Sequence, residues 1–259
     1  MSSYYLFSDA HLGTTARDDD RQRQERVLEF LDHVRRCGAG LYIVGDLLDF
    51  WFEYRHVIPS SNFPVLAKLY ELSRAGMPID YLAGNHDLWL GDFLRQQVGL
   101  RVHADGIIRD LHGSKCLIIH GDGIAARDGG YRFMKRIFKN RVNIALFRWL
   151  HPDLGVKIAK AMSNTSRKVK DNRYTWEADY KAYAEARFAE GFDVVIMGHT
   201  HEPLFESIGG HYFINLGDWM DHFTYCEIDR DGPRLRCWPG GQMYEPAGKR
   251  SSLSRVPVE

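Results

Sequence analysis

Long apolar runs, disulfide-type cysteine patterns and a leader-like N-terminus are all lacking in this sequence of 259 residues. No run reaches the roughly 18 apolar residues of a membrane-spanning helix, so no spanning segment is predicted. Four cysteines, none of them in a CxxC pair, favour reduced thiols in a cytoplasmic protein over a disulfide framework. The opening residues MSSYYLFSDAHLG meet charge too early for a secretory signal. The sequence therefore indicates one large globular domain, or a domain with an insertion.

An excess of charge of either sign is also lacking, because 34 Lys and Arg balance 34 Asp and Glu. The balance is uneven along the chain, since residues 131–173 contain twelve basic residues and two acidic ones. This segment carries a charge of +10, and the rest of the chain carries −10. We therefore expect an anionic partner for the middle segment.

Apolar spacing alternates between strand and helix along most of the chain. Strands are predicted in YYLF, GLYIV, MPIDYLA and FDVVIM, and helices in DRQRQERVLEFLDHVRR, FPVLAKLYELSRAG and WEADYKAYAEARFAEG. Hairpins are predicted with turns at 112–114, 209–210 and 231–232. Strands that alternate with helices and end in hairpins indicate an α/β domain with a mixed sheet and helices outside it.

Residues 131–173 are predicted to form a helical insertion, in which apolar residues make a stripe among the basic ones and Pro152 interrupts the helix. We interpret it as a cap, at about 129–173, on a single domain of residues 1–244. Residues 245–259 form a polar tail that we expect to be disordered. The stripe also fits a plainer interpretation, a solvated basic helix whose apolar side only packs on the domain.

Polar clusters follow five of the predicted strands. They are Asp9-Ala10-His11, Gly45-Asp46-Leu47-Leu48-Asp49, Gly84-Asn85-His86-Asp87, His120-Gly121-Asp122 and Gly198-His199-Thr200-His201. Loops at the carboxyl ends of strands in an α/β sheet gather at one edge, so we expect all five clusters to converge there. A single cluster of this kind arises easily by chance, whereas five in succession indicate a site.

The chemistry of the converging side chains is that of a transition-metal site. Carboxylate, imidazole and amide oxygen are ligands for Mn²⁺, Zn²⁺ or Fe. The spacing Asp-x-His or His-x-His places both side chains on the same side of an extended backbone. The ligands outnumber the needs of one ion, and two ions about 3.5–4 Å apart with a shared carboxylate would use them.

The order D-x-H, GD-x-x-D, GNHD, H-G-D, GHTH resembles the calcineurin-like metallophosphoesterase superfamily over roughly residues 3–238. The resemblance implies a four-layer αββα sandwich with an inserted helical cap. It implies that one metal is held by Asp9, His11, Asp46 and His201, and that Asp46 bridges to a second, held with Asn85, His120 and His199. It implies that His86, Asp46 and Asn85 are catalytic, with His86 contacting the phosphoryl group or the leaving oxygen.

Three stretches, GDLLDFWFEY, GNHDLWLGDFL and HGDGIAARDGGYRFMKR, resemble the UDP-2,3-diacylglucosamine diphosphatases of lipid A biosynthesis. That resemblance implies hydrolysis of the substrate's pyrophosphate bond to 2,3-diacylglucosamine 1-phosphate (lipid X) and UMP. It implies two divalent ions, most simply Mn²⁺, and a peripheral enzyme on the anionic cytoplasmic face of the inner membrane. The implied substrate-binding residues are Asn85, His86, Asp128, Ser166, Arg173 and His199.

Several alternatives stay open on the sequence alone. A major branch of that family has GNRD where this chain has GNHD, so His86 indicates a divergent branch. A metallophosphoesterase acting on nucleotides, other phosphodiesters or phosphoproteins is the second hypothesis, and a metal-holding binding module without turnover is the third. Nucleic acid competes for the basic segment, although we do not expect it as a partner. Asp49 and Asp87 either orient His86 or support the turns in which they lie.

Overall fold

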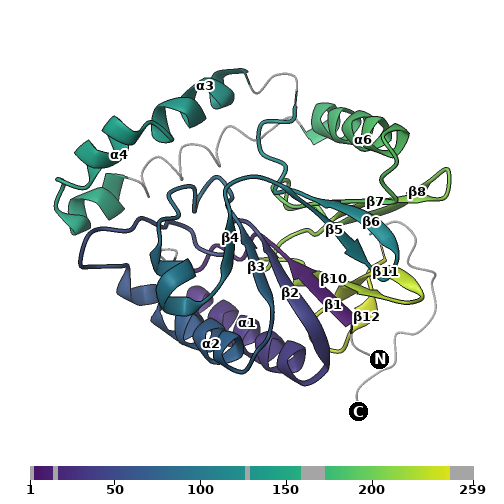
Figure 1. Cartoon of the computed structure of the whole chain (residues 1–259), viewed down its shortest axis with the longest axis horizontal. Coiled ribbons are helices and arrows are strands. Elements are labelled where there is room, and N and C mark those ends of the chain that lie inside the picture. The colour runs from purple at the N-terminus through teal and green to yellow at the C-terminus, as the bar shows by residue number, and fades with distance from the viewer. Residues whose placement is uncertain (1–2, 14–16, 126–128, 159–172, 246–259) are drawn as a thin grey trace, which may run out of the picture.

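The computed structural model describes residues 3–13, 17–125, 129–158 and 173–245. Two β-sheets pack face to face, and helices cover the outer face of each (Figure 1). This confirms the predicted four-layer αββα sandwich. Both sheets are mixed, as the alternation of strands and helices predicted, but apolar spacing did not divide the strands between two sheets, because it identifies strands without showing which of them pair. Within the described ranges, none of the helices has the length and apolar content needed to cross a bilayer.

The first sheet has seven strands in the order β12-β11-β10-β1-β2-β3-β4. Its strands are β1 (Ser3–Phe7), β2 (Gly38–Val44), β3 (Ile79–Leu82), β4 (Arg101–His103), β10 (Thr224–Asp229), β11 (Gly232–Cys237) and β12 (Gln242–Met243). β1 to β4 run parallel, whereas β10 pairs with β1 in the antiparallel sense. The parallel half therefore presents the carboxyl ends of neighbouring strands at one edge.

The second sheet has five strands in the order β5-β6-β7-β9-β8. Its strands are β5 (Ile107–Leu111), β6 (Ser114–Ile118), β7 (Val194–Met197), β8 (Leu204–Ile208) and β9 (His211–Asn215). β6, β7 and β9 run parallel, and the edge strands are antiparallel. The predicted turns at 112–114 and 209–210 are confirmed: His112, Gly113, Gly209 and Gly210 all have positive φ, as tight hairpin turns require.

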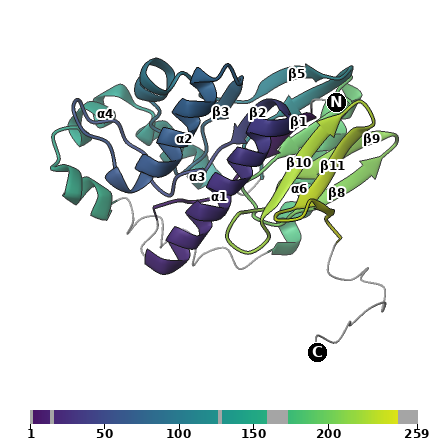
Figure 2. The ribbon, with the colours of Figure 1, turned by 90° about the horizontal axis from the view of Figure 1, so that it is seen from below.

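Two helices, α1 (Arg17–Cys37) and α2 (Phe63–Arg74), cover the first sheet, and α6 (Arg173–Ala189) covers the second. A single 3₁₀ turn, η1 (Ser60–Asn62), comes directly before α2, and a short π-helix, η2 (Leu94–Val98), lies between β3 and β4. The segment predicted as a cap, which is called the cap from here on, contains α3 (Gly129–Phe138), α4 (Arg141–Phe147) and a helical stretch at 152–158. Pro152 opens that stretch, at the first helical position where proline costs no hydrogen bond. α4 lies at the end of the molecule opposite β8 and β11 (Figure 1, Figure 2).

The layers are held together by three apolar clusters. One lies between α1, α2 and the first sheet, one lies between the two sheets, and one lies between α6 and the second sheet. Phe30 of α1 is fully buried at the centre of the first cluster, where its ring centroid lies 4.9 Å from those of Trp219 and Tyr225. This helix therefore ties β1 to the hairpin that follows β9.

Phe30→Ala is expected to lower the free energy of unfolding by roughly 3–5 kcal/mol, because it leaves a cavity among packed aromatic rings. Equilibrium unfolding in urea measures the change. The matched control is Phe63→Ala at the start of α2, where the side chain is 68% exposed; there the change should stay within about 0.5 kcal/mol. Equal losses in the two variants would contradict the assigned core.

Candidate metal centre

The five polar clusters come together at the carboxyl ends of five strands. Three of these strands, β1, β2 and β3, belong to the first sheet, and β6 and β7 belong to the second. The site therefore spans the edges of both sheets where they face each other. All seven residues predicted as ligands lie at this edge: Asp9, His11, Asp46, Asn85, His120, His199 and His201.

The backbone at this edge has an unusual conformation. Within the described ranges, seven residues other than glycine have positive φ, and five of them are predicted ligands: Asp9, His11, Asp46, His199 and His201. Such residues are strained unless their surroundings hold them. Hydrogen bonds between the loops do so: the Asp9 N–H donates to the Gly45 carbonyl at 3.2 Å, and the His11 N–H donates to the Asp46 carbonyl at 3.0 Å.

Glycines let the carboxylates approach the backbone closely. A Cβ at Gly84 would lie 2.1 Å from Asp46 Oδ1, and a Cβ at Gly198 would lie 2.5 Å from Asp9 Oδ2. Both contacts are far below van der Waals distance, so the glycines of GNHD and GHTH are required by packing against the two aspartates.

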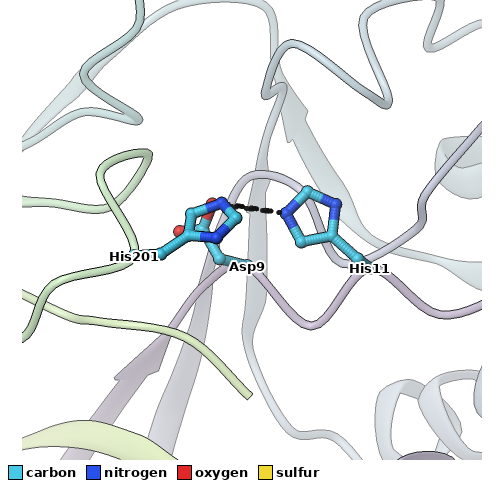
Figure 3. Close-up of side chains that lie close together, drawn as sticks. All are labelled: Asp9, His11 and His201. Carbon is cyan, nitrogen blue, oxygen red and sulfur yellow. Dashed lines mark hydrogen bonds and ion pairs between the residues drawn. The ribbon is translucent and has the colours of Figure 1, made fainter. Parts of the chain in front are cut away.

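Asp9, His11 and His201 form one half of the centre (Figure 3). The Nε2 atoms of the two histidines are 3.2 Å apart, and His201 Nε2 is 3.3 Å from Asp9 Oδ1. Asp9 is fully buried, and its Oδ1 finds no hydrogen-bond donor among the described residues. A buried carboxylate oxygen and two facing imidazole nitrogens are the donor set that a divalent cation satisfies.

Asp46, Asn85, His120 and His199 form the other half. Asn85 Oδ1 lies 3.2 Å from His120 Nε2 and 2.8 Å from His199 Nδ1. His120 Nδ1 donates to the Val44 carbonyl at 2.9 Å, which leaves Nε2 facing the centre as the nitrogen able to bind a metal.

Asp46 lies between the two halves. Its Oδ2 is 3.8 Å from His11 Nε2 in the first half and 3.4 Å from His120 Nε2 in the second. Its Oδ1 accepts the N–H of His86 at 2.8 Å, which fixes the carboxylate. Asp46 thus occupies the place of a bridging ligand, and the residues present fit two adjacent divalent cations.

Charges within the centre override the effect of burial. Burial alone would raise the pKa of Asp9 and Asp46, but the surrounding imidazoles hold both well below the usual range. Burial alone would lower the pKa of His11 and His120, but neighbouring carboxylates raise it to about 9 for His11 and about 10 for His120. The carboxylates of the centre are therefore ionised and are stabilised by the positive charge of neighbouring imidazoles, a charge that a bound cation would replace.

The structure separates the two carboxylates that were candidates for orienting His86. The Asp49 carbonyl accepts a hydrogen bond from His86 Nδ1 at 3.0 Å, and Asp49 Oδ1 lies 3.6 Å from the same atom. Asp87 instead accepts the Tyr81 hydroxyl at 2.5 Å and the Gly84 N–H at 2.7 Å. Asp49 therefore contacts His86, whereas Asp87 supports the GNHD turn. Burial lowers the pKa of His86 and raises that of Asp87 to about 6.

Three remaining predicted residues lie outside the described ranges or have side chains that are not described. Asp122, two residues after His120, is paired with Lys135 of α3 at 2.5 Å, and its charge contributes to the raised pKa of His120. Asp128 and Ser166 lie outside the described residues, and Arg173 begins α6 with a side chain that is not described. Sequence reasoning missed Asp218, whose Oδ2 is 3.9 Å from His201 Nδ1, because the stretch before it was interpreted as a hairpin, whereas Asp218 lies in the loop from β9 of the second sheet to β10 of the first.

The fold and the carboxylate–imidazole centre define a metal-dependent phosphoesterase. The sequence model of the family described as "Calcineurin-like phosphoesterase" matches residues 3–203, and the chain belongs to this family. It is a metal-dependent hydrolase, as the resemblance predicted.

Three relatives share the name UDP-2,3-diacylglucosamine hydrolase. The protein from Porphyromonas gingivalis is 32% identical over 247 residues, which cover 88% of this chain and 94% of the relative. The protein from Haemophilus ducreyi is 30% identical, with 90% and 98% covered, and that from Pseudomonas fluorescens is 30% identical, with 89% and 93% covered. The similarity thus extends well beyond the ligand clusters.

Loading the centre with Mn²⁺ is expected to release protons. His11 and His120, with pKa values of about 9 and about 10 before loading, are protonated at pH 7.5 and must become neutral to bind a metal. Apparent affinity should therefore rise with pH until both rings have lost their protons, at about pH 10. Titration calorimetry in two buffers of different ionisation enthalpy measures the release. His120→Asn should release fewer protons, and a binding heat independent of the buffer would contradict this assignment.

Proposed function

We propose that the protein hydrolyses the pyrophosphate bond of UDP-2,3-diacylglucosamine, giving 2,3-diacylglucosamine 1-phosphate (lipid X) and UMP in lipid A biosynthesis. The observation that carries this proposal is the similarity, over about nine-tenths of each chain, to relatives named for that substrate. The centre supplies the matching chemistry, since hydrolysis of a phosphoanhydride needs charge stabilisation on phosphoryl oxygens.

The ligand assignment forms part of the proposal. One divalent cation would be held by Asp9, His11, Asp46 and His201, and the other by Asp46, Asn85, His120 and His199, consistent with the two halves of the centre. Such cations offset the charge of the phosphoryl oxygens and lower the pKa of water. The imidazole, carboxylate and amide donors suit Mn²⁺, our first choice, as well as Zn²⁺ or Fe.

His86 is proposed to contact the phosphoryl group or its leaving oxygen. The Asp49 carbonyl can only accept a hydrogen bond, so His86 Nδ1 carries a proton. Nε2 is then the nitrogen left for the substrate, and it donates a hydrogen bond only when the ring is positively charged. Because burial lowers the pKa of His86, the ring is neutral in the free protein and its Nε2 accepts hydrogen bonds; donation to a phosphoryl oxygen would require a proton on Nε2, which the negative charge of a bound pyrophosphate would favour. Asn85 and His199 are proposed to lie against the substrate beside it.

A cavity of about 390 Å³ lies between the cap and the loop that follows His86. Phe52, Trp89 and Ile144 give it an apolar lining, and basic residues stand around it: Lys139, Arg141 and Arg148. The Trp89 Nε1–H donates to the carbonyl of Phe138, so the loop and the cap are joined at this point. An acylated, negatively charged substrate matches a wall of this composition.

We keep the proposed domain organisation, in which a cap at about 129–173 is inserted into a domain of residues 1–244. Asp128, Ser166 and Arg173 remain proposed substrate contacts.

The cap is also proposed to touch the membrane. Large apolar side chains are exposed on α3, α4 and the turn after α4: Phe133, Met134, Ile137, Val142, Leu146 and Trp149. Basic residues accompany them, and exposed Arg136 and Arg141 suit an anionic surface. We propose peripheral association with the cytoplasmic face of the inner membrane. Lys135 and Lys139 are less suited to this role, because they contact Asp122 and Asp105 of the main domain.

Turnover decides the proposed reaction. The protein loaded with Mn²⁺ should release UMP from UDP-2,3-diacylglucosamine faster than it cleaves bis-p-nitrophenyl phosphate, and chromatography of the nucleotide product measures this. His120→Ala should reduce turnover by about 100-fold or more, since loss of residues that only support ligands already costs about 10–100-fold.

The control is His211→Ala, at the far end of β9 from the centre, which should leave turnover unchanged. If the protein cleaves simple diesters but not UDP-2,3-diacylglucosamine, the proposed reaction is wrong and the protein is a general phosphodiesterase. Wild-type turnover in His120→Ala would contradict the ligand assignment.

Trp149→Ala is expected to weaken binding to vesicles of anionic lipid by roughly tenfold, because about 1.4 kcal/mol of apolar transfer is lost. The Trp149 side chain is 89% exposed in the turn after α4. Co-sedimentation with vesicles measures the binding. Tyr70→Ala, on α2 and 49% exposed, serves as the control and should bind as the wild type does. If Trp149→Ala binds vesicles as the wild type does, the plainer interpretation holds, in which the cap is a solvated basic helix whose apolar side only packs on the domain.

A further inference from the structure

The segment 215–224, formed by the last residue of β9 and the loop that follows it, contacts the loops of the Asp9–His11–His201 half of the centre. The Trp219 N–H donates to the Asp9 carbonyl at 3.1 Å. Asn215 Nδ2 donates to the Gly198 carbonyl at 3.0 Å and to Thr200 Oγ1 at 2.8 Å. The segment thus holds two ligand loops that come from different sheets.

Asp218, within this segment, is a buried carboxylate with a fixed orientation. It is 2% exposed. Its Oδ1 accepts the backbone N–H groups of Met220 at 3.1 Å, Asp221 at 2.9 Å and His222 at 3.0 Å. Three donors on one oxygen hold the side chain against the backbone, and Oδ2 is on the side of His201.

His201 stands between Asp218 and the centre. Its Nε2 is 3.3 Å from Asp9 Oδ1 and 3.2 Å from His11 Nε2, whereas its Nδ1 is 3.9 Å from Asp218 Oδ2. One ring nitrogen therefore faces the other donors and the other faces a carboxylate. A histidine that binds a metal commonly directs its second N–H to such a carboxylate, which fixes the tautomer and makes the ligand more basic.

We propose that Asp218 is a positioning residue for His201: its Oδ2 directs the Nδ1–H of the ring, so that Nε2 is presented to the cation shared with Asp9 and His11. This inference rests on the proposed metal assignment. It adds a residue that acts through a ligand and touches neither cation nor substrate.

Asp218 has two roles that use different oxygen atoms, and substitution can separate them. Oδ1 caps the turn after it, and Oδ2 faces His201. In Asp218→Asn the amide oxygen can still accept the three backbone N–H groups. The amide nitrogen that replaces Oδ2 carries hydrogens and repels the Nδ1–H of His201. Asp218→Ala removes both roles.

The experiment measures Mn²⁺ binding by titration calorimetry, together with the midpoint of urea unfolding for each variant. Asp218→Asn should unfold near the wild-type midpoint and bind one of two Mn²⁺ ions about 10–100-fold more weakly. Asp110→Asn is the matched control, because Asp110 also caps a turn, accepting the Gly113 N–H at 2.8 Å in the β5–β6 hairpin. Its Mn²⁺ binding should equal that of the wild type.

A double-mutant cycle tests whether Asp218 acts through His201. Adding Asp218→Asn to His201→Ala should cause no further loss of affinity, because the group that Asp218 positions is already gone. Additive losses of Mn²⁺ affinity would overturn the proposal, and non-additive losses would support it. This criterion holds even if Asp218→Asn proves as unstable as Asp218→Ala.

The proposed function and this inference fail in different ways. Wild-type protein that binds no Mn²⁺, or only one ion, contradicts the two-cation centre itself. Wild-type protein that binds two ions, with Asp218→Asn binding both within twofold of the same affinity, overturns only the role of Asp218.

Discussion

The position of the Asp46 carboxylate is the constraint on which the rest of the structure depends. A buried carboxylate without compensation costs several kcal/mol, so the fold must bring positive or donor groups to it. It does so from three strands at once: the His86 N–H from the loop after β3, His120 from β6 and His11 from β1. Strands of both sheets end at one rim because the parallel halves of the sheets face each other there. The layered architecture thus serves to gather these loops.

Gathering seven ligands at one rim costs backbone strain, and most of the non-glycine residues with positive φ in the described ranges lie in the ligand loops. Five ligands have positive φ, and each adjoins a loop fixed by hydrogen bonds from a neighbouring strand end. Arg23 of α1 also fixes the first ligand loop, because its side chain donates to the carbonyls of Ala10 and His11 at 3.2 and 3.1 Å. The apolar cluster around Phe30 anchors that helix, so packing energy far from the centre holds the ligands in an otherwise unfavourable conformation.

Much of this arrangement could be predicted from sequence, for a physical reason. Each buried strand is a continuous apolar run, and a buried polar cluster at its end needs partners, so runs such as VVIM before GHTH identify both strand and site. The residue pattern alone could not divide the strands between two sheets, because pairing depends on contacts distant in sequence. The short strand β4 was missed because two of its residues are polar. Arg101 and His103 pair with the buried carboxylate of Asp80 at 2.5 and 2.7 Å. Asp218 was missed because its role depends on a neighbour seventeen residues earlier in the chain.

The cap and the centre are joined through side chains that belong to the ligand loops. Asp122 lies two residues after His120 and pairs with Lys135 of α3, while Trp89 lies three residues after His86 and donates to the Phe138 carbonyl at the end of the same helix. The last turn of α3 is thereby connected to two loops that carry ligands. Arg132 adds a third link by donating to the Gly123 and Ala125 carbonyls at 3.1 and 2.9 Å. A displacement of the cap must therefore pull on the loops of His86 and His120. The wall proposed to receive a lipid chain and the residues proposed to receive a phosphoryl group are therefore connected through the same loops.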